Sequence, residues 1–352
     1  MRKQFLILGN FLGKKIVGLT RMGYEYLLQI DKFADSFDIE LLIPVGYKKY
    51  VPTLTNIKVV ELGNDSSGWT TRYATNYARK KRKTVINLTS PFCLNKNSVI
   101  EIADVRYMEK VHGQFFDDFN FRFKMFLRAF LGTRQAKYVA TISNFSKERI
   151  HELLHVNNSR IVVIPCGWEH MNRVRENEDI FSKYTMIKKG EYFFTLGSLA
   201  RHKNHRFIIK LAQQNPKMKF VIAGGVDPQI FYKDCPTENI DNVVFTGRIS
   251  DEEIKTLMTY CKAFIFPSLY EGFGIPPLEA MSCGAPVIVS DIPVMREIFK
   301  DSVHYLDLNS NSIDLTNLLD ETIQRPELIL NEYSWNNAGE GWYELFKLIE
   351  NE

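Results

Sequence analysis

The chain has 352 residues, 45% of them hydrophobic and 13% aromatic, which supplies enough apolar side chains for two globular domains. Two domains are expected because a single hydrophobic core rarely grows beyond about 300 residues. Its five scattered cysteines form no C-x-x-C pair, so we expect neither a disulfide framework nor a zinc site. No apolar run approaches the length of a membrane-spanning helix, and residues 5–8 are too few for a signal peptide, so we expect a cytoplasmic protein.

The net charge of +4 is unevenly distributed along the chain. Residues 1–172 contain 26 Lys and Arg against 15 Asp and Glu, a net +11, whereas residues 173–352 contain 19 against 26, a net −7. This asymmetry predicts two domains with different partners. A basic first half suits an anionic membrane or a phosphate-bearing acceptor, and nucleic acid is the alternative.

Short apolar runs alternate with amphipathic stretches in the first half of the chain. Helical patterns lie between several of these runs, for example at residues 24–33 and 146–154. The alternation predicts a parallel α/β sheet. The predicted strands are Phe5–Leu8, Ile39–Ile43, Ile57–Leu62, Val85–Leu88, Val139–Ile142 and Ile161–Ile164.

Two segments of the first half are candidates for contact with an anionic membrane or acceptor. Residues 119–131 form a helical pattern that places Phe119, Phe123, Phe126, Leu127 and Phe130 near one face, with cations elsewhere on the helix. The alternative is a helix docked in the core whose cations extend to solvent. The second segment is a run of five cations, which forms either a solvated surface or a site for phospholipid or a polyprenyl diphosphate: Arg79, Lys80, Lys81, Arg82 and Lys83.

The second half repeats the pattern of strands and helices after a polar, charged stretch. A helical pattern rich in aromatic residues then ends the chain, from residue 334 onward. The repeat predicts a second parallel sheet. Its predicted strands are Tyr192–Leu196, Phe220–Ile222, Val243–Phe245, Ala263–Phe266 and Val287–Val289.

The segment from Lys262 to Asp291 carries the strongest functional signal. A buried strand is followed by a glycine-rich turn, a helix that starts near Pro276, and another strand. A helix that begins at the carboxyl end of a parallel strand presents backbone N–H groups and the positive end of its dipole to an anion. The segment therefore predicts a phosphate-binding site.

Two glutamates flank this turn, and the stretch Glu271–Met281 resembles the E-x7-E motif of retaining glycosyltransferases of family 4, enzymes with the GT-B fold. In that family the second glutamate binds the donor ribose, which here implies Glu279, and the first, here Glu271, lies beside the donor sugar. The alternative for Glu279 is a structural role, in which an acid early in a helix stabilises the dipole. The resemblance assigns the donor sugar and its distal phosphate to the backbone of the turn: Gly272, Phe273, Gly274 and Ile275.

The resemblance implies an α/β protein of the GT-B fold, with two Rossmann-like parallel-sheet domains that face an interdomain cleft. We expect an acceptor-binding domain at residues 1–170, a linker at 171–190 and a nucleotide-sugar domain at 191–333. In GT-B proteins the last helix packs back on the first domain, and the aromatic residues at 334–352 suit that role.

The loop after the first strand of the second half resembles a basic family loop that binds the donor diphosphate. Lys203 and Asn204 match the family pattern directly. Ser198 and His202 stand where the family usually has arginine, and Arg201 is the neighbouring replacement. A lysine here places a point charge against a diphosphate, whereas a merely solvated basic loop is the alternative.

Further donor contacts are implied by resemblance at two other strand ends. Arg248 and Ile249 follow the strand at 243–245, where the family has its nucleobase pocket. Gly18 and Arg21 resemble a glycine turn that approaches the diphosphate in the first domain.

His112 resembles a family histidine that contacts the donor sugar at the end of a strand of the first domain. Gly113 replaces the aspartate that usually follows it, and Asp117 and Asp118 are the carboxylates that could compensate. A histidine satisfied in the core or at the surface is the alternative.

We therefore expect a nucleotide-sugar-dependent glycosyltransferase with His112, Glu271 and Lys203 as catalytic candidates. The resemblance implies retention of configuration without a metal, no D-x-D sequence is present, and no cofactor is expected. The expected acceptor is a saccharide or a polyprenyl-diphosphate-linked saccharide in bacterial surface polysaccharide synthesis. That role suits peripheral contact with the inner face of the plasma membrane.

Three other functions compete with this hypothesis. A nucleotide-sugar epimerase or phosphorylase of the same fold is one, although a small soluble substrate needs neither the basic first half nor the aromatic helix. An inactive homologue that serves as a partner subunit is another. A nucleic-acid-binding protein is the third, but no aromatic residues are interleaved with the cations at 79–83, so no nucleic-acid partner is expected.

Overall fold

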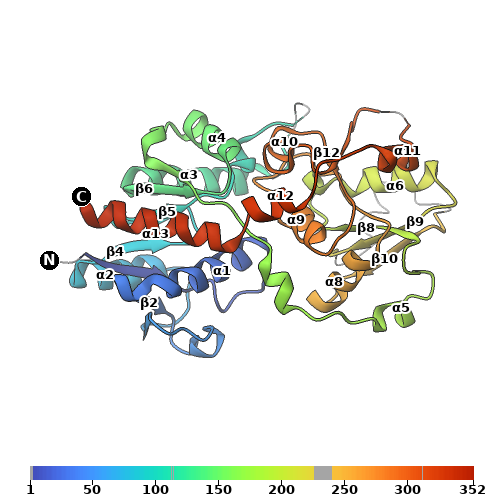
Figure 1. Cartoon of the computed structure of the whole chain (residues 1–352). Coiled ribbons are helices and arrows are strands. Elements are labelled where there is room, and N and C mark those ends of the chain that lie inside the picture. Colours follow the sequence, from blue (N-terminus) through green and yellow to red (C-terminus); the bar gives the residue numbers. More distant parts are fainter. Residues whose placement is uncertain (1–2, 112, 114, 226–239, 311) are drawn as a thin grey trace. The chain divides into compact units, whose positions relative to one another are not determined.

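The computed structural model describes residues 3–111, 113, 115–225, 240–310 and 312–352. This part of the chain forms two compact units, each built on a parallel sheet (Figure 1). Unit 1 comprises Met1–Lys110, Asp117–Cys166 and Tyr333–Glu352, and unit 2 comprises Val111–Phe116 and Gly167–Glu332. The two parallel sheets confirm the predicted α/β class.

The described sheet of unit 1 has seven strands in the order β3-β2-β1-β4-β5-β6-β7, and its pairings are parallel. All six strands predicted in this half are confirmed. The sequence analysis missed β5, because three residues are too few to reveal a strand pattern. The strands are β1 (Gln4–Leu8), β2 (Asp38–Ile43), β3 (Lys58–Glu61), β4 (Thr84–Asn87), β5 (Val99–Glu101), β6 (Tyr138–Thr141) and β7 (Ile161–Val163).

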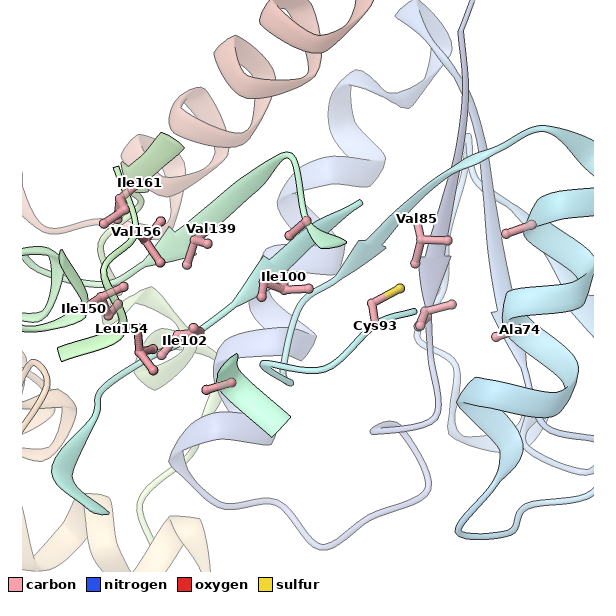
Figure 2. Packing of buried hydrophobic residues seen from close by; sticks show 14 of the residues in the cluster. Ala74, Val85, Cys93, Ile100, Ile102, Val139, Ile150, Leu154, Val156 and Ile161 are labelled. Atoms are coloured by element: carbon pink, nitrogen blue, oxygen red, sulfur yellow. The ribbon is translucent and has the colours of Figure 1, made fainter. Parts of the chain in front are cut away.

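Successive side chains of β1 point to opposite faces of this sheet. Leu6 and Leu8 belong to the core cluster of which Figure 2 shows a part, and Phe5 packs on the other face, where its ring centroid lies 4.5 Å from that of Phe346. Burial of each such side chain contributes about 2 kcal/mol. The helices of unit 1 are α1 (Gly18–Phe33), α2 (Thr75–Lys81), α3 (Phe119–Gln135), α4 (Asn144–Leu154) and α13 (Trp335–Asn351).

Helix α13 lies beside α1, as Figure 1 shows in red and blue. The ring of Tyr26 in α1 is 5.8 Å from Trp335 and 5.5 Å from Trp342, centroid to centroid. The Tyr26 hydroxyl donates to the carbonyl of Ile164 at 2.7 Å, so this buried ring keeps its polar group hydrogen-bonded. The aromatic residues of the last helix thus complete the core of unit 1.

The described sheet of unit 2 has six strands in the order β10-β9-β8-β11-β12-β13, again with parallel pairings. All five strands predicted in this half are confirmed, and the three-residue strand β13 was missed. The strands are β8 (Tyr192–Leu196), β9 (Lys219–Ala223), β10 (Val243–Gly247), β11 (Ala263–Phe266), β12 (Val287–Ser290) and β13 (His304–Leu306). The helices are α5 (Asp179–Lys183), α6 (His205–Gln214), α8 (Asp251–Tyr260), α9 (Ile275–Ser282), α10 (Pro293–Phe299), α11 (Leu315–Asp320) and α12 (Glu327–Glu332).

The polar stretch at 171–190, expected as a linker, is attached to unit 2. The Lys255 ammonium of α8 donates to the carbonyls of Met171 at 3.0 Å and Val174 at 2.9 Å. The backbone N–H of Asn177 donates to the Thr256 hydroxyl at 2.8 Å. Composition did not reveal this attachment, because these bonds use backbone groups that every sequence carries.

Candidate functional site

The carboxyl ends of β8 and β11 bring two loops of unit 2 together. The strands are parallel neighbours, with Phe264 of β11 opposite Phe194 of β8. Residues 197–204 follow β8, and residues 267–274 follow β11. Ligands of open α/β sheets bind at this edge of the sheet, so residues distant in the sequence meet where a ligand is expected.

Lys203 and Glu271 join these loops through a short ion pair. The Lys203 Nζ lies 2.6 Å from Glu271 Oε1, and the two side chains are only 18% and 14% exposed. The Asn204 amide donates to the carbonyl of Pro267 at 3.1 Å, and Asn204 has a left-handed φ of 53°. The structure thus brings three predicted residues into one constellation, although the sequence separates them by up to 68 positions.

Helix α9 begins directly after the glycine-rich turn. Gly274 has a φ of 120°, and a Cβ at this position would lie 3.0 Å from the ring of Phe299, so the turn requires glycine. Pro276 and Pro277 carry no N–H, which leaves Gly274 and Ile275 as the N–H donors at the start of the helix. The predicted helix terminus after the glycine-rich turn is therefore present with few N–H donors, and its binding of an anion stays a prediction.

Glu279 is held by a residue that the sequence analysis did not single out. Its Oε1 lies 2.7 Å from Nε2 of His170, and both residues are buried. Glu279 is the fifth residue of α9, whose first turn contains no acid, so it lies beyond the turn in which a carboxylate best stabilises the dipole. Its 109-residue separation from His170 explains why no local pattern indicated the pair.

Backbone hydrogen bonds join the glycine turns that follow neighbouring strands of unit 2. The N–H of Gly197 donates to Ala223 at 3.0 Å, and that of Gly224 donates to Gly247 at 2.8 Å. Gly224 has a φ of 102°, and a Cβ there would lie 2.6 Å from the carbonyl oxygen of Gly197. These contacts continue the edge from β8 through β9 to β10.

Arg248 and Ile249 follow β10, three strand positions from β11. Arg248 is exposed and Ile249 is half-buried. At about 4.8 Å per strand, the loops after β10 and β11 are separated by about 14 Å along the edge. The predicted nucleobase residues therefore lie three strands away from the predicted sugar residues along this edge, and Lys203 and Asn204 follow a strand between them.

The loop after β8 holds the other predicted phosphate residues. Ser198 and Arg201 are exposed, and among the residues that the structure describes none pairs with the Arg201 guanidinium. His205 Nε2 lies 3.0 Å from the carbonyl oxygen of Ser198. Burial lowers the pKa of His205 to about 4, and the nearby Lys203 charge acts in the same direction. His205 is therefore neutral at pH 7 and supports the loop without adding charge.

Residues 176–336 match the family described as "Glycosyl transferases group 1". The match covers most of unit 2. The constellation around Lys203, Glu271 and Glu279 lies within the matched region, which confirms the expected resemblance, and the match is consistent with glycosyltransferase family 4.

Proteins similar to this chain include two named mannosyltransferases. The O-antigen chain mannosyltransferase RfbU of Salmonella typhimurium is 31% identical over 242 residues, which cover 66% of this chain and 62% of that protein. The O-antigen chain mannosyltransferase B of Escherichia coli is 27% identical over 236 residues, 61% of each chain. The chain thus spans less than two thirds of the length of either relative.

Solved glycosyltransferase structures share the fold of this chain. Anabaena Alr3699/HepE in complex with UDP and glucose has a TM-score of 0.68 at 16% identity, and the match covers 98% of this chain and 99% of that one. WaaG, a glycosyltransferase involved in lipopolysaccharide biosynthesis, has a TM-score of 0.63 at 16% identity, with 99% and 98% covered. The likeness confirms the GT-B fold class expected from the sequence.

The predicted residues of unit 1 lie in structural surroundings that differ from those expected. Gly18 and Arg21 form the first turn of α1 rather than a loop. His112 lies outside the described residues, and the apolar run before it forms a 3-10 turn, Arg106–Met108, where we expected a strand. The turn forms because Asp104 accepts from the backbone N–H of Arg106 at 2.9 Å, which bends the chain after β5.

Asp117 and Asp118, the carboxylates nearest to Gly113, both have structural partners. Asp117 Oδ2 lies 2.7 Å from the Arg106 guanidinium, and Asp118 caps α3 by accepting from the N–H of Phe121 at 2.9 Å. To take the role of the family aspartate, Asp117 would have to break its ion pair with Arg106, and Asp118 its hydrogen bond to the N–H of Phe121.

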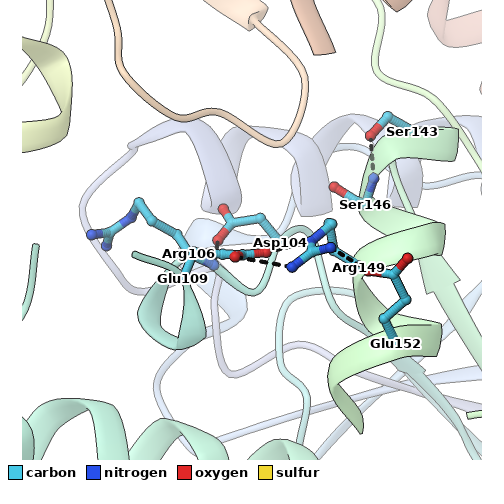
Figure 3. Close-up of polar contacts among 7 residues, drawn as sticks. All are labelled: Asp104, Arg106, Glu109, Ser143, Ser146, Arg149 and Glu152. Atoms are coloured by element: carbon cyan, nitrogen blue, oxygen red, sulfur yellow. Dashed lines mark hydrogen bonds and ion pairs between the residues drawn. The ribbon is translucent and has the colours of Figure 1, made fainter. Parts of the chain in front are cut away.

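A polar network lies between the chain after β5 and the start of α4 (Figure 3). Arg149 forms ion pairs with Glu109 and Glu152, and Ser143 caps α4 by accepting from the N–H of Ser146 at 3.0 Å. Glu109 is thereby held just before the segment that contains His112. The sequence analysis missed this network, because its residues show no motif.

The five-cation run and the aromatic helix differ from their predicted arrangement. Lys83 is buried, and its Nζ lies 3.3 Å from Glu40 Oε2 and 3.7 Å from Asp38 Oδ1, so it is a structural cation. Arg79, Lys80, Lys81 and Arg82 are exposed on α2 and at its end. Lys83 does not belong to the predicted exposed surface. It immediately precedes β4, and its side chain lies close to the two acids of β2.

The exposed stripe of α3 also differs from the predicted face. Phe126 packs against the core of unit 1 and Phe130 is half-buried, whereas Phe123 is 55% exposed. The reason is that α3 carries two adjacent rows of apolar side chains spaced four residues apart. The row that contains Phe123 faces solvent, and the row that contains Phe126 faces the core. The exposed row is Phe119, Phe123, Leu127 and Leu131.

Among the described residues, no helix is long and apolar enough to span a membrane. In that same part of the chain, no cluster of three or more His, Cys, Asp or Glu side chains suits a metal ion.

Proposed function

We propose that the chain is a glycosyltransferase that moves a sugar, with retention of configuration and without a metal, from a nucleotide-sugar donor to a saccharide acceptor. The ion pair of Lys203 with Glu271 at the start of α9 carries the proposal. It puts a cation, a carboxylate and a helix N-terminus at the edge of the sheet where α/β proteins bind nucleotides.

The donor diphosphate is proposed to lie against Lys203 and the N–H groups of Gly274 and Ile275. A leaving diphosphate gains negative charge, and prearranged cations and N–H groups stabilise that charge in the transition state. Lys203 is held by Glu271, so its ammonium is ordered before the donor arrives. This order lowers the conformational cost of binding.

The transfer is proposed to proceed on one face of the sugar. The bond from the anomeric carbon to the phosphate oxygen breaks, the bond to the acceptor oxygen forms on the same side, and the leaving phosphate accepts the acceptor's proton. This route needs no enzyme nucleophile, and the described site presents no carboxylate without a close partner, since Glu271 and Glu279 are both paired.

The proposed sugar is mannose, and the proposed product is a bacterial surface polysaccharide. The support is the similarity to two relatives that are named O-antigen chain mannosyltransferases.

Peripheral contact with an anionic membrane is proposed for unit 1. The exposed row of α3 supplies apolar side chains, and Lys124 on the same helix and the four exposed cations at 79–82 supply complementary charge. An interfacial helix combines these two features.

The test is calorimetric titration with UDP-, GDP-, dTDP- and ADP-linked mannose and glucose, with and without divalent metal, followed by transfer to a lipid-linked saccharide. We expect one mannosyl donor to bind without metal and to give a product whose anomeric configuration, read by NMR, equals that of the donor. Inversion would refute retention, and no donor binding would favour the inactive-partner alternative. Epimerised donor in the absence of acceptor would favour the epimerase.

A further inference from the structure

A cavity of about 460 Å³ lies at the amino ends of the central strands of unit 1. Its lining includes Thr84, the first residue of β4, the segment 94–97 just before β5, and Gln135, the last residue of α3. In a parallel sheet the amino ends lie at the edge opposite to the carboxyl ends. The cavity is therefore separate from the strand edge at which open α/β sheets usually bind ligands.

The lining of this cavity is cationic. Four of its ten residues are Lys or Arg and none is an acid: Ala78, Arg79, Arg82, Lys83, Thr84, Leu94, Asn95, Lys96, Asn97 and Gln135. Lys83 is neutralised by Glu40. Within the described chain no ion pair is formed by the other three cations, and all three are exposed. A formal charge of about +3 around one cavity attracts a polyanion.

The backbone around the cavity is held in a defined conformation. Arg82 ends α2 with a left-handed φ of 55°, and its N–H donates to the carbonyls of Ala78 and Arg79. The segment 94–97 is tied down through buried Asn95, whose carbonyl accepts from the Ser98 hydroxyl at 2.8 Å and whose amide donates to Thr75 at 3.4 Å. The cations from α2 and from this segment are therefore presented by ordered backbone.

Cations at the end of a helix complement its dipole, and that alone accounts for Arg79 and Arg82. It does not account for Lys96, which comes from a different segment and borders the same cavity. Nor does it account for the absence of acids from the lining, or for the amides of Asn95, Asn97 and Gln135 beside the cations. Guanidinium and ammonium groups with neutral N–H donors are the groups that recognise phosphate.

We propose that this cavity binds a phosphate-bearing ligand, with Arg79, Arg82 and Lys96 as its cationic contacts. Its volume suits a phosphomonoester or diphosphate group of a small molecule or a lipid headgroup. The site is independent of the proposed donor site, because it is formed entirely by unit 1, whereas Lys203 and Glu271 belong to unit 2.

The test is calorimetric titration of the full chain with inorganic pyrophosphate. In the first variant Arg79→Gln, Arg82→Asn and Lys96→Gln are combined, with asparagine at 82 because it tolerates the left-handed backbone. The matched control combines Lys14→Gln, Lys48→Gln and Lys49→Gln, which removes the same charge from exposed positions of unit 1 outside the lining. We expect the first variant to lose at least about tenfold in affinity and the control to change less than about threefold.

Lys203→Ala separates this site from the donor site, because it removes a donor contact and leaves the cavity intact. Pyrophosphate binding that persists in Lys203→Ala and is lost in the cavity variant supports the proposal even if no donor binds. Native-like affinity in the cavity variant, or equal losses in both triple variants, would overturn it, as would no binding to the native chain.

Co-sedimentation with vesicles of phosphatidylglycerol or phosphatidylcholine identifies the source of the phosphate. Binding to phosphatidylglycerol that pyrophosphate displaces and that the cavity variant loses supports a lipid headgroup. Pyrophosphate binding without such vesicle binding supports a soluble phosphate ligand. Circular dichroism and urea unfolding confirm that each variant is folded.

Discussion

His170 Nε2 lies 2.7 Å from Glu279 Oε1 in the interior of unit 2, across 109 residues of sequence. The contact joins the segment after β7 to α9, the helix that begins at the glycine-rich turn. It orients the glutamate that the E-x7-E resemblance assigns to the donor ribose. His170 is therefore a positioning residue, and its removal should affect both donor binding and folding stability.

Replacement of His170 by Phe should weaken donor binding about tenfold, because the aromatic ring keeps the volume but no longer orients the carboxylate. The unpaired carboxylate also costs about 1–3 kcal/mol of unfolding free energy. His170→Gln retains a donor and should recover part of the affinity. Calorimetry and urea unfolding measure the two effects, and unchanged donor affinity in His170→Phe would remove this residue from the site.

Replacement of Lys203 by Met should reduce donor affinity about 10- to 100-fold, because a charge-assisted contact to the diphosphate contributes about 1.5–3 kcal/mol. The matched control is Lys217→Met, an exposed lysine of unit 2, which should bind donor like the native chain. A double-mutant cycle with Glu271→Gln measures the coupling of the ion pair. Equal affinities in the two lysine variants would contradict the proposed role.

The stability of the protein should fall as the pH drops from about 6.5 to about 4, in part because of His205. Burial lowers its folded-state pKa to about 4, below its ordinary value of 6.5. Between these pH values His205 binds a proton in the unfolded chain but not in the folded chain. The contribution of neutral His205 to the free energy of unfolding is therefore fully present above pH 6.5 and is lost by about pH 4. The maximum loss is about 3 kcal/mol.

Urea unfolding of the native chain and of His205→Gln at pH 7 and pH 4.5 isolates this effect. The difference between the two proteins should shrink at the lower pH. A difference that stays constant over the window would show that His205 does not titrate as its burial implies.

Replacement of Lys83 by Met should destabilise the protein by about 3 kcal/mol, because Glu40 loses its buried cationic partner. Lys81→Met removes an exposed cation from the same run and should change stability by less than about 0.5 kcal/mol. Chemical denaturation measures both. Similar values for the two variants would mean that Lys83 belongs to the solvated surface after all.

Substitution of the exposed row of α3 tests the proposed membrane contact. Phe123→Ser with Leu127→Ser should reduce co-sedimentation with phosphatidylglycerol vesicles about tenfold or more, because two apolar anchors are lost. Val45→Ser with Leu348→Ser is the control, since both side chains are exposed elsewhere on unit 1. If the control pair loses as much binding, the contact is not specific to α3.

The sequence by itself determined most of the secondary structure and the local order of strand, glycine turn and helix around Glu271. It did so because buried parallel strands are continuous apolar runs, and because glycine and proline restrict the backbone locally. Eleven predicted strands are present, the strand expected before His112 is a 3-10 turn instead, and the two that were missed, β5 and β13, have only three residues each.

Only the tertiary structure decided which of these residues touch. Glu271 meets Lys203 because the sheet places β11 beside β8, and Glu279 meets His170 because the segment after β7 packs on α9. Lys83 and the row of α3 that contains Phe126 turned inward for the same reason. A sequence pattern reports the local backbone and its periodicity, whereas the partner of a charge depends on strand order and packing between distant segments.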